Sequence, residues 1–272
     1  MMNKKFKYVF ITIIVAPLII SIVTLTIAEL PRESSPKTDL TFMTYNIHFG
    51  QGMDDLLNLE RIAQNILIDD PDIIGLQEVR VGRIETQGID MAFWLAKRLG
   101  MEYYYFNPIN NPHEMGNAIL SKYPILIKNG FELPSTHMER TLVHCAVQIS
   151  SNLKIDVFCT HIGIRNENKT AQINFLLEKI TEISISSTKV LMGDFNLRND
   201  TLEIGNVLTY FNDTAEEYGA DPRAPIDYIF ATGYQNILNS HVITDMLTNI
   251  DSPAEYGSDH LPVVSIIRYP FI

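Results

Sequence analysis

Apolar runs that end in a carboxylate, an amide or an imidazole recur along this chain, and the clearest of them is Val190 to Asn196. Asp194 and Asn196 lie there on either side of Phe195. Alternate side chains of an extended strand point to one face, so we expect the two polar groups to lie together at a strand end. Asp194 can orient or deprotonate a water, and the Asn196 amide can donate to a phosphoryl oxygen. Taken alone, the pattern is equally typical of a polar turn.

Strand-like and helical periodicities alternate over most of the chain. Apolar residues recur with helical spacing in 56–67, 89–99 and 168–183. Strand-like runs occupy 40–48, 73–78, 103–106, 116–121, 141–150, 154–161, 190–196, 226–230 and 263–268. Some of these strands follow one another directly and others are separated by a helix. The order predicts an α/β protein with mixed sheets, and a hydrophobic content of 46% is sufficient for a large core.

The N-terminus has the properties of a membrane-targeting segment. Residues 9–28 carry no charge and are long enough to cross the hydrocarbon layer. Three lysines precede them and few basic residues follow, so the positive-inside rule places the rest of the chain outside the cytoplasm. An uncleaved transmembrane helix is favoured over a signal peptide, whose apolar region usually has only ~7–15 residues.

The expected organisation is an anchor or signal segment (1–29), a linker (30–38) and one domain (39–272). The protein is then a single-pass protein of the cell membrane with an extracytoplasmic domain, or a secreted protein if the first segment is cleaved. The sequence has no feature that indicates a protein partner.

The charge of the chain limits its partners. The formal net charge is −11 at pH 7. Binding a nucleic acid usually requires a basic surface that neutralises several phosphates. A lipid or a small molecule is therefore favoured over nucleic acid as the substrate.

The two cysteines, Cys145 and Cys159, lie on neighbouring strand-like runs. A symmetric hairpin would set them roughly opposite each other, and a strained cross-strand disulfide would then be available in an oxidising compartment. Two buried free thiols are the slightly favoured alternative.

Seven short motifs, all in one order, carry a resemblance to a known family. They are Thr44-Tyr45-Asn46-Ile47-His48, Leu76-Gln77-Glu78-Val79, Gly116-Asn117-Ala118-Ile119-Leu120-Ser121, Thr160-His161, Gly193-Asp194-Phe195-Asn196, Ile226-Asp227-Tyr228-Ile229 and Ser258-Asp259-His260. The series resembles the endonuclease/exonuclease/phosphatase superfamily of deoxyribonuclease-I-like, metal-dependent phosphohydrolases. The resemblance spans about residues 40–268. It implies a four-layer α/β/β/α sandwich of two mixed β-sheets flanked by helices, with the site at one edge of both sheets.

The resemblance also implies a metal site and a phosphate site. Glu78, Asn46 and Asp259 would hold Mg²⁺, or Mn²⁺ in its place, because hard cations prefer oxygen ligands. Asp194 would orient or deprotonate the attacking water, and Asn196 would steady the phosphorus centre.

Further roles implied by the resemblance concern contacts to the substrate. His260, held by Asp227, would contact or protonate a phosphoryl oxygen, and His161 would be a second acid facing the phosphate. Asn117 and Arg140 would bind the substrate.

These roles predict a metal-dependent phosphoric ester hydrolase in which water attacks phosphorus in line with the leaving group. The favoured substrate is a lipid head group or another small phosphodiester at the extracytoplasmic membrane face. The alternative is a membrane-tethered or secreted endonuclease or exonuclease, for which the loop 107–113 and the pair Arg80 and Arg83 could follow a phosphate backbone. A binding module without catalysis is a third hypothesis, and the intact set of acids and histidines argues against it.

Overall fold

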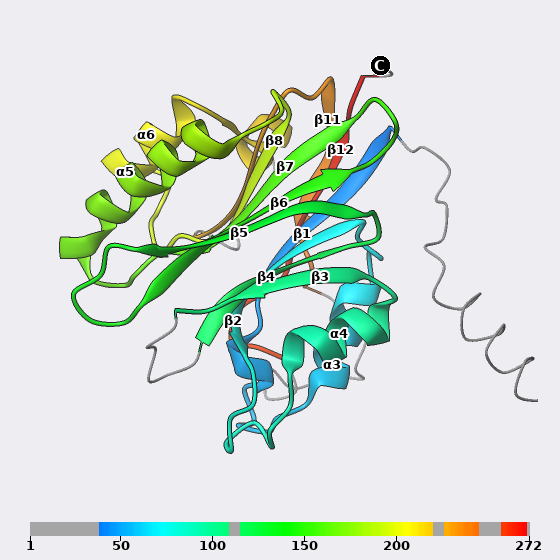
Figure 1. Ribbon diagram of the computed structural model, residues 1–272, viewed down its shortest axis with the longest axis vertical. Coiled ribbons are helices and arrows are strands. Elements are labelled where there is room, and N and C mark those ends of the chain that lie inside the picture. Colours follow the sequence, from blue (N-terminus) through cyan, green and yellow to red (C-terminus); the bar gives the residue numbers. More distant parts are fainter. Residues whose placement is uncertain (1–37, 109–114, 220–225, 245–256, 271–272) are drawn as a thin grey trace, which may run out of the picture. The chain divides into compact units, whose positions relative to one another are not determined.

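The computed structural model describes residues 38–108, 115–219, 226–244 and 257–270 (Figure 1). The chain divides into two units, 1–35 and 36–272, and all described residues belong to the second. The expected anchor, and all of the expected linker except residue 38, lie outside the described residues. Among the helices that the structure describes, none is long and apolar enough to span a membrane.

Two mixed six-stranded sheets form the centre of the second unit (Figure 1). The first sheet has the order β11 (Asn236–Val242), β12 (Val263–Arg268), β1 (Asp39–Asn46), β2 (Ile73–Arg80), β4 (Met115–Ser121) and β3 (Glu102–Phe106). The second has the order β5 (Ile125–Leu133), β6 (Arg140–Gln148), β7 (Lys154–His161), β8 (Lys189–Asp194), β10 (Asp227–Thr232) and β9 (Asn212–Asp213). One pair of strands in each sheet is parallel, β1 with β2 and β7 with β8.

Helices cover the outer face of each sheet. Helices α3 (Leu59–Leu67) and α4 (Met91–Leu99) share an apolar cluster with the first sheet. Helices α5 (Asn166–Ile183) and α6 (Leu202–Leu208) do the same on the second sheet. Two short elements complete the set, η2 (His48–Gly50) and α7 (Thr214–Tyr218). The four-layer order of helices, sheet, sheet and helices confirms the expected sandwich, while its expected N-terminal helix lies outside the described residues.

The core between the two sheets follows from strand alternation. On β1, Leu40 and Phe42 face the second sheet, whereas Met43 and Tyr45 pack beneath the helices, as does Ile47 just after the strand. The same period of two carries Asn46 onto the face turned toward the second sheet. On β8, Val190 and Met192 lie in the inter-sheet core, so Asp194 extends that row from the opposite side.

Both cysteines lie in the inter-sheet core as free thiols. Cys145 is opposite Val157, and Cys159 is opposite Val143, so the two cysteines are diagonal rather than directly opposite. The expected pairing of Cys145 with Cys159 is wrong, because the observed register sets Cys145 opposite a residue two positions away. The favoured alternative, two buried free thiols, is confirmed. Burial raises the pKa of Cys159 to about 12.

Candidate active site

Strand ends from both sheets meet at one edge of the domain. The chain leaves β1, β2, β7 and β8 there through Asn46, Glu78 near the end of β2, His161 and Asp194. Strands β6 and β10 begin at the same edge with Arg140 and Asp227. Because each polar group lies at one end of a buried strand, its backbone is fixed by the ladder. The edge therefore brings together residues that are distant in sequence.

Glu78 reaches the site through an irregularity of β2. Its φ is 57°, in the left-handed region, and the register with β4 shifts between Leu76 and Val79. A non-glycine residue at positive φ costs of order 1–3 kcal/mol and persists where the surrounding structure enforces it. Here the irregularity is a β-bulge, which re-aims a side chain. Gln77 meanwhile stays buried and bonds Thr44.

Asp194 is the centre of the polar cluster. Its Oδ2 lies 3.1 Å from Asn46 Nδ2, 3.3 Å from His161 Nε2 and 3.7 Å from His260 Nε2. The carboxyl is buried, and this burial, together with the nearby charge of Asp227, raises its pKa from 3.8 to about 7. The charge of His260 and the hydrogen bonds from Asn196 and Asn46 oppose the rise.

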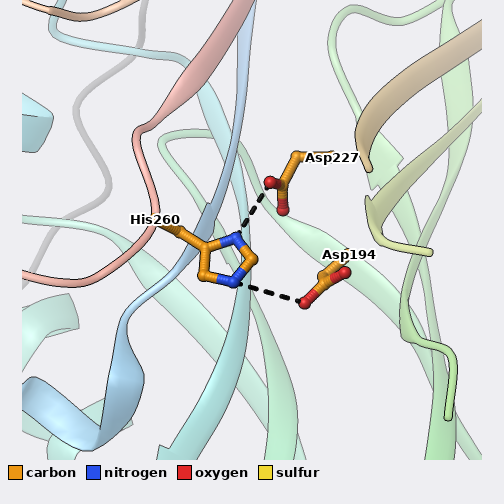
Figure 2. A group of neighbouring side chains, drawn as sticks. All are labelled: Asp194, Asp227 and His260. Atoms are coloured by element: carbon orange, nitrogen blue, oxygen red, sulfur yellow. Dashed lines mark hydrogen bonds and ion pairs between the residues drawn. The ribbon is translucent and has the colours of Figure 1, made fainter. Parts of the chain in front are cut away.

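His260 lies between two carboxylates (Figure 2). Its Nδ1 is 2.9 Å from Asp227 Oδ2, while its Nε2 faces Asp194. Burial alone would lower the pKa of His260, but the bond to Asp227 and the charges of Asp227, Asp194 and Asp259 outweigh it and raise the pKa to about 9. The ring is therefore an imidazolium at neutral pH, held in place by Asp227.

Ser258 ties the turn that carries His260 to β1. The sequence motifs contain Ser258, but the sequence alone gave it no role. Ser258 Oγ donates to the Asn46 carbonyl at 2.7 Å and accepts from the His260 backbone N–H at 3.2 Å. Ser258 is buried. Its position next to Asp259 and His260 was the signal in the sequence, because a hydroxyl beside functional residues often fixes a turn.

His161 is held in its neutral form. Burial lowers its pKa well below 6.5, and the positive charges of Arg140 and His260 add to this effect. Arg140 Nη1 lies 3.2 Å from Nδ1, and because a guanidinium can only donate, Nδ1 must be the acceptor. The proton therefore sits on Nε2, which can donate to Asp194. In this arrangement His161 is a hydrogen-bond donor; its expected role as an acid facing the phosphate stays a prediction.

Asn196 is placed by the turn that follows β8. Its φ is 50°, and its N–H donates to Asp194 Oδ1 at 2.9 Å. The side-chain Nδ2 donates to the Ile162 carbonyl at 2.9 Å. It also lies 3.1 Å from His161 Nε2, which carries the ring proton and so does not accept from it. Asp194 and Asn196 thus lie at the same strand end, as the alternation around Phe195 predicts.

The remaining expected residues lie around this centre. Asn117 donates twice to Thr141, at 2.9 Å to the carbonyl and 2.8 Å to Oγ1. Arg140 is buried, which lowers its pKa, although a guanidinium stays protonated in proteins. Asp259 is more open, with 45% of its side chain exposed, and its carboxylate lies 3.9 Å from His48 Nδ1. Of the three expected metal ligands, Glu78 and Asn46 are in contact, at 3.3 Å, and Asp259 is directed toward His48.

The donor set fits a hard divalent cation. Glu78 and Asn46 offer oxygens, and no lysine or arginine of the described ranges forms an ion pair with Glu78. The amide of Asn46 directs Nδ2 at Glu78 and Asp194, so it would have to turn over to offer Oδ1. Asp194, Asp227 and His260 are also close enough to one another to share an ion. The charge expected on His260 disfavours a cation there, so Glu78 and Asn46 are the better candidates.

Comparisons with known proteins agree with this geometry. The sequence model of the Endonuclease/Exonuclease/phosphatase family matches residues 43–260, more than half of the chain. The uncharacterized protein YbhP of Escherichia coli is 28% identical over 166 residues, which cover 57% of this chain and 65% of YbhP.

Two solved structures share the fold. Mannosyl-6-phosphatase Bt3783 of Bacteroides thetaiotaomicron is 20% identical, with a TM-score of 0.70, over 85% of this chain and 100% of that one. Truncated Caenorhabditis elegans TDP2 is 22% identical, with a TM-score of 0.67, over 85% of this chain and 97% of that one. The family match, together with strand ends that gather its motifs at one edge, shows that the chain belongs to the endonuclease/exonuclease/phosphatase family.

Proposed function

We propose that this protein is a Mg²⁺-dependent phosphodiesterase in which Asp194 activates a water for in-line attack on phosphorus. One observation carries the proposal. The buried Asp194 carboxyl has a pKa raised to about 7 and lies 3.1–3.7 Å from Asn46, His161 and His260. A carboxylate whose pKa lies near the working pH is well suited to act as a general base.

The other side chains fit the remaining needs of the reaction. Asp194 would take the water proton as the water oxygen bonds to phosphorus. The His260 imidazolium, oriented by Asp227, would donate through Nε2 to a phosphoryl or leaving oxygen. Asn196 and Arg140 would donate to the phosphoryl oxygens, whose charge must be neutralised. A bound Mg²⁺, held by Glu78 and Asn46 with Asp259 as the third expected ligand, would supply further charge neutralisation.

The proposed substrate is a lipid head group or another small phosphodiester at the extracytoplasmic membrane face. The uncharged N-terminal segment 9–28 and the net charge of −11 support a membrane-associated, non-nucleic-acid substrate. The name of the Bacteroides phosphatase further indicates that this fold accommodates small phosphorylated compounds.

A second candidate function is that of a tethered or secreted nuclease, and one observation favours it. Arg80 lies two residues beyond Glu78, with its Cζ 4.1 Å from the centre of the Phe49 ring. No ion pair within 4.0 Å involves Arg80 in the described ranges, although its charge helps to lower the pKa of Glu85, so the guanidinium can still face a second phosphate. A nucleic acid would supply such a phosphate.

The decisive experiment assays the full chain in detergent with bis(4-nitrophenyl) phosphate, phospholipid vesicles and plasmid DNA. We expect hydrolysis that EDTA abolishes and Mg²⁺ restores, with a loss of roughly 100-fold or more in kcat for Asp194→Asn. Asp200→Asn, at an exposed acid of the next loop, is the matched control and should retain activity. Hydrolysis that survives both EDTA and Asp194→Asn would exclude the mechanism. Cleavage of DNA alone, with steep salt dependence, would favour the nuclease.

A further inference from the structure

A small pocket with a cavity volume of about 10 Å³, enough for one water-sized group, opens beside the proposed reaction centre. Glu78, Arg140 and His161 line it, and so does Glu139, which has no role in the chemistry proposed above. Pockets that enclose a whole drug-sized ligand hold roughly 300–1,000 Å³, so this one takes only a small group. A larger hollow between α5 and α6 contains none of the residues of the site.

Two polar atoms of this pocket lack partners. Glu139 Oε2 and Arg140 Nε are both shielded from solvent, and neither has a hydrogen-bond partner within the part of the chain that the structure describes. Buried polar atoms are almost always paired, so such a pair of exceptions requires an explanation. The two atoms belong to neighbouring residues but do not bond each other.

Two nearby donors are directed away from Glu139 Oε2. Both hydrogen bonds of Asn117 Nδ2 go to Thr141, and Arg140 Nη1 is directed at His161. A ligand can therefore supply the acceptor for Arg140 Nε and the donor for Glu139. A phosphoryl oxygen can satisfy the arginine, and a hydroxyl or ammonium group can satisfy the carboxylate.

The charge of the pocket distinguishes among ligands. Mg²⁺ at Glu78 would offset the charge of that carboxylate, and His161 is neutral, which leaves the Glu139 carboxylate beside the Arg140 cation. Once Arg140 faces the reacting phosphate, a second phosphate here would meet the Glu139 carboxylate. A neutral hydroxyl or a cationic ammonium would be accepted.

We infer that Glu139 forms a specificity subsite for the alcohol esterified to the phosphate, and that it accepts a hydrogen bond from a hydroxyl or ammonium group of that alcohol. The inference rests on the proposed phosphodiesterase function and names its substrate class: phosphodiesters of hydroxyl- or amine-bearing alcohols, such as those of phospholipid head groups. Glu139 positions the substrate and takes no part in bond making or breaking.

The test uses 4-nitrophenyl phosphodiesters that differ only in the second alcohol, namely methanol, glycerol and ethanolamine. All three release 4-nitrophenol, so one assay gives kcat/KM for each. We expect the full chain to prefer the glycerol and ethanolamine esters over the methyl ester by about 10- to 100-fold, the range for a hydrogen bond to a charged group. Glu139→Ala should abolish this preference. Glu139→Gln, which keeps an acceptor but loses the charge, should reduce the ethanolamine preference more than the glycerol preference.

The control is Glu132→Gln, at an exposed glutamate on β5, which should retain the wild-type preference. If the Glu139 variants lose kcat/KM equally on all three esters, with an unchanged melting temperature, the inference is overturned. The proposed phosphodiesterase function would still stand. Recovery of kcat/KM by Glu139→Gln at high Mg²⁺ would also overturn the inference, because Glu139 would then be a metal ligand. Absence of hydrolysis of every ester by the wild-type chain would instead refute the proposed function.

Discussion

Replacement of Asp194 by asparagine should stabilise the fold while it destroys activity. The carboxyl is 2% exposed, and its pKa rises from 3.8 in an exposed setting to about 7 in the site. Since one pKa unit is equivalent to 1.36 kcal/mol, the ionised form costs the folded state about 4 kcal/mol at pH 8. An asparagine avoids this cost. It retains only part of the hydrogen bonding of Asp194 to Asn46 and Asn196, so a net gain of about 2 kcal/mol is expected.

The sign of the pH dependence follows from the direction of the shift. Between about pH 4 and pH 7 the unfolded chain has lost the Asp194 proton while the folded chain keeps it, so the wild type loses stability as the pH rises. The difference in unfolding free energy between the variant and the wild type should therefore grow from about pH 4 to pH 7 and stay constant above pH 7. For a domain of this size, 2 kcal/mol corresponds to roughly 4–8 °C in melting temperature.

The assay is thermal unfolding of both proteins in EDTA from pH 4 to pH 8, followed by the same series with Mg²⁺. A cation near Asp194 would stabilise its carboxylate, so Mg²⁺ should narrow the difference between the two proteins. Asp200→Asn again serves as the control. Its melting temperature should equal that of the wild type, because the residue is exposed. A variant that melts at or below the wild-type temperature at pH 8 in EDTA would refute the assignment of Asp194 as a destabilised buried acid.

Four further outcomes follow from the contacts and the burial described above. Asp227→Asn should lower the pKa of His260 from about 9 to near or below 6.5, which NMR titration of the ring can measure; an unchanged value would exclude Asp227 as its partner. Because that pKa is raised on folding, its contribution to stability is fully present below about pH 6.5 and should be lost as the pH rises through 9. Gly75→Ala should destabilise the domain by about 1–3 kcal/mol in urea unfolding, since the new Cβ would lie 2.7 Å from Met192 Cγ; no change would mean that the sheets can separate at little cost. Cys145 and Cys159 should react with a thiol reagent only after unfolding, because both are buried and their pKa values are raised; reaction in the native state would contradict that burial.

The central strands were predictable from sequence, whereas two of the edge strands, β5 and β11, were not. Strands β1, β2, β8 and β12 are buried on both faces or alternate strictly, and each was expected close to its observed bounds. Strand β5 lies at the edge of the second sheet, is partly exposed and contains Gly130, so its pattern is weak. Strand β11 is the edge of the first sheet, and a register shift between Ile237 and Asn239 interrupts its alternation. Both strands were absent from the sequence prediction.

The sequence predicted which residues form the candidate site better than it predicted the contacts between them. The family resemblance implied that Asn46 and Asp194 belong to one site, and the two side chains lie 3.1 Å apart. The bulge at Glu78 left no local signal, because a strained φ is imposed by the surrounding ladder rather than by the residue type. The contact of Arg140 with His161 depends on the pairing of β6 with β7, which no pattern within either strand specifies.

The cluster around Asp194 straddles the seam between the two sheets. Asn46 and Glu78 come from one sheet, and Asp194, Asp227 and His161 come from the other. The distances between the groups of the site therefore depend on how the two sheets pack against each other. Gly75 and Met192 contribute to the layer between the sheets that sets this spacing. Hydrostatic pressure or a remote substitution that slides one layer over the other would alter turnover without touching any side chain of the cluster.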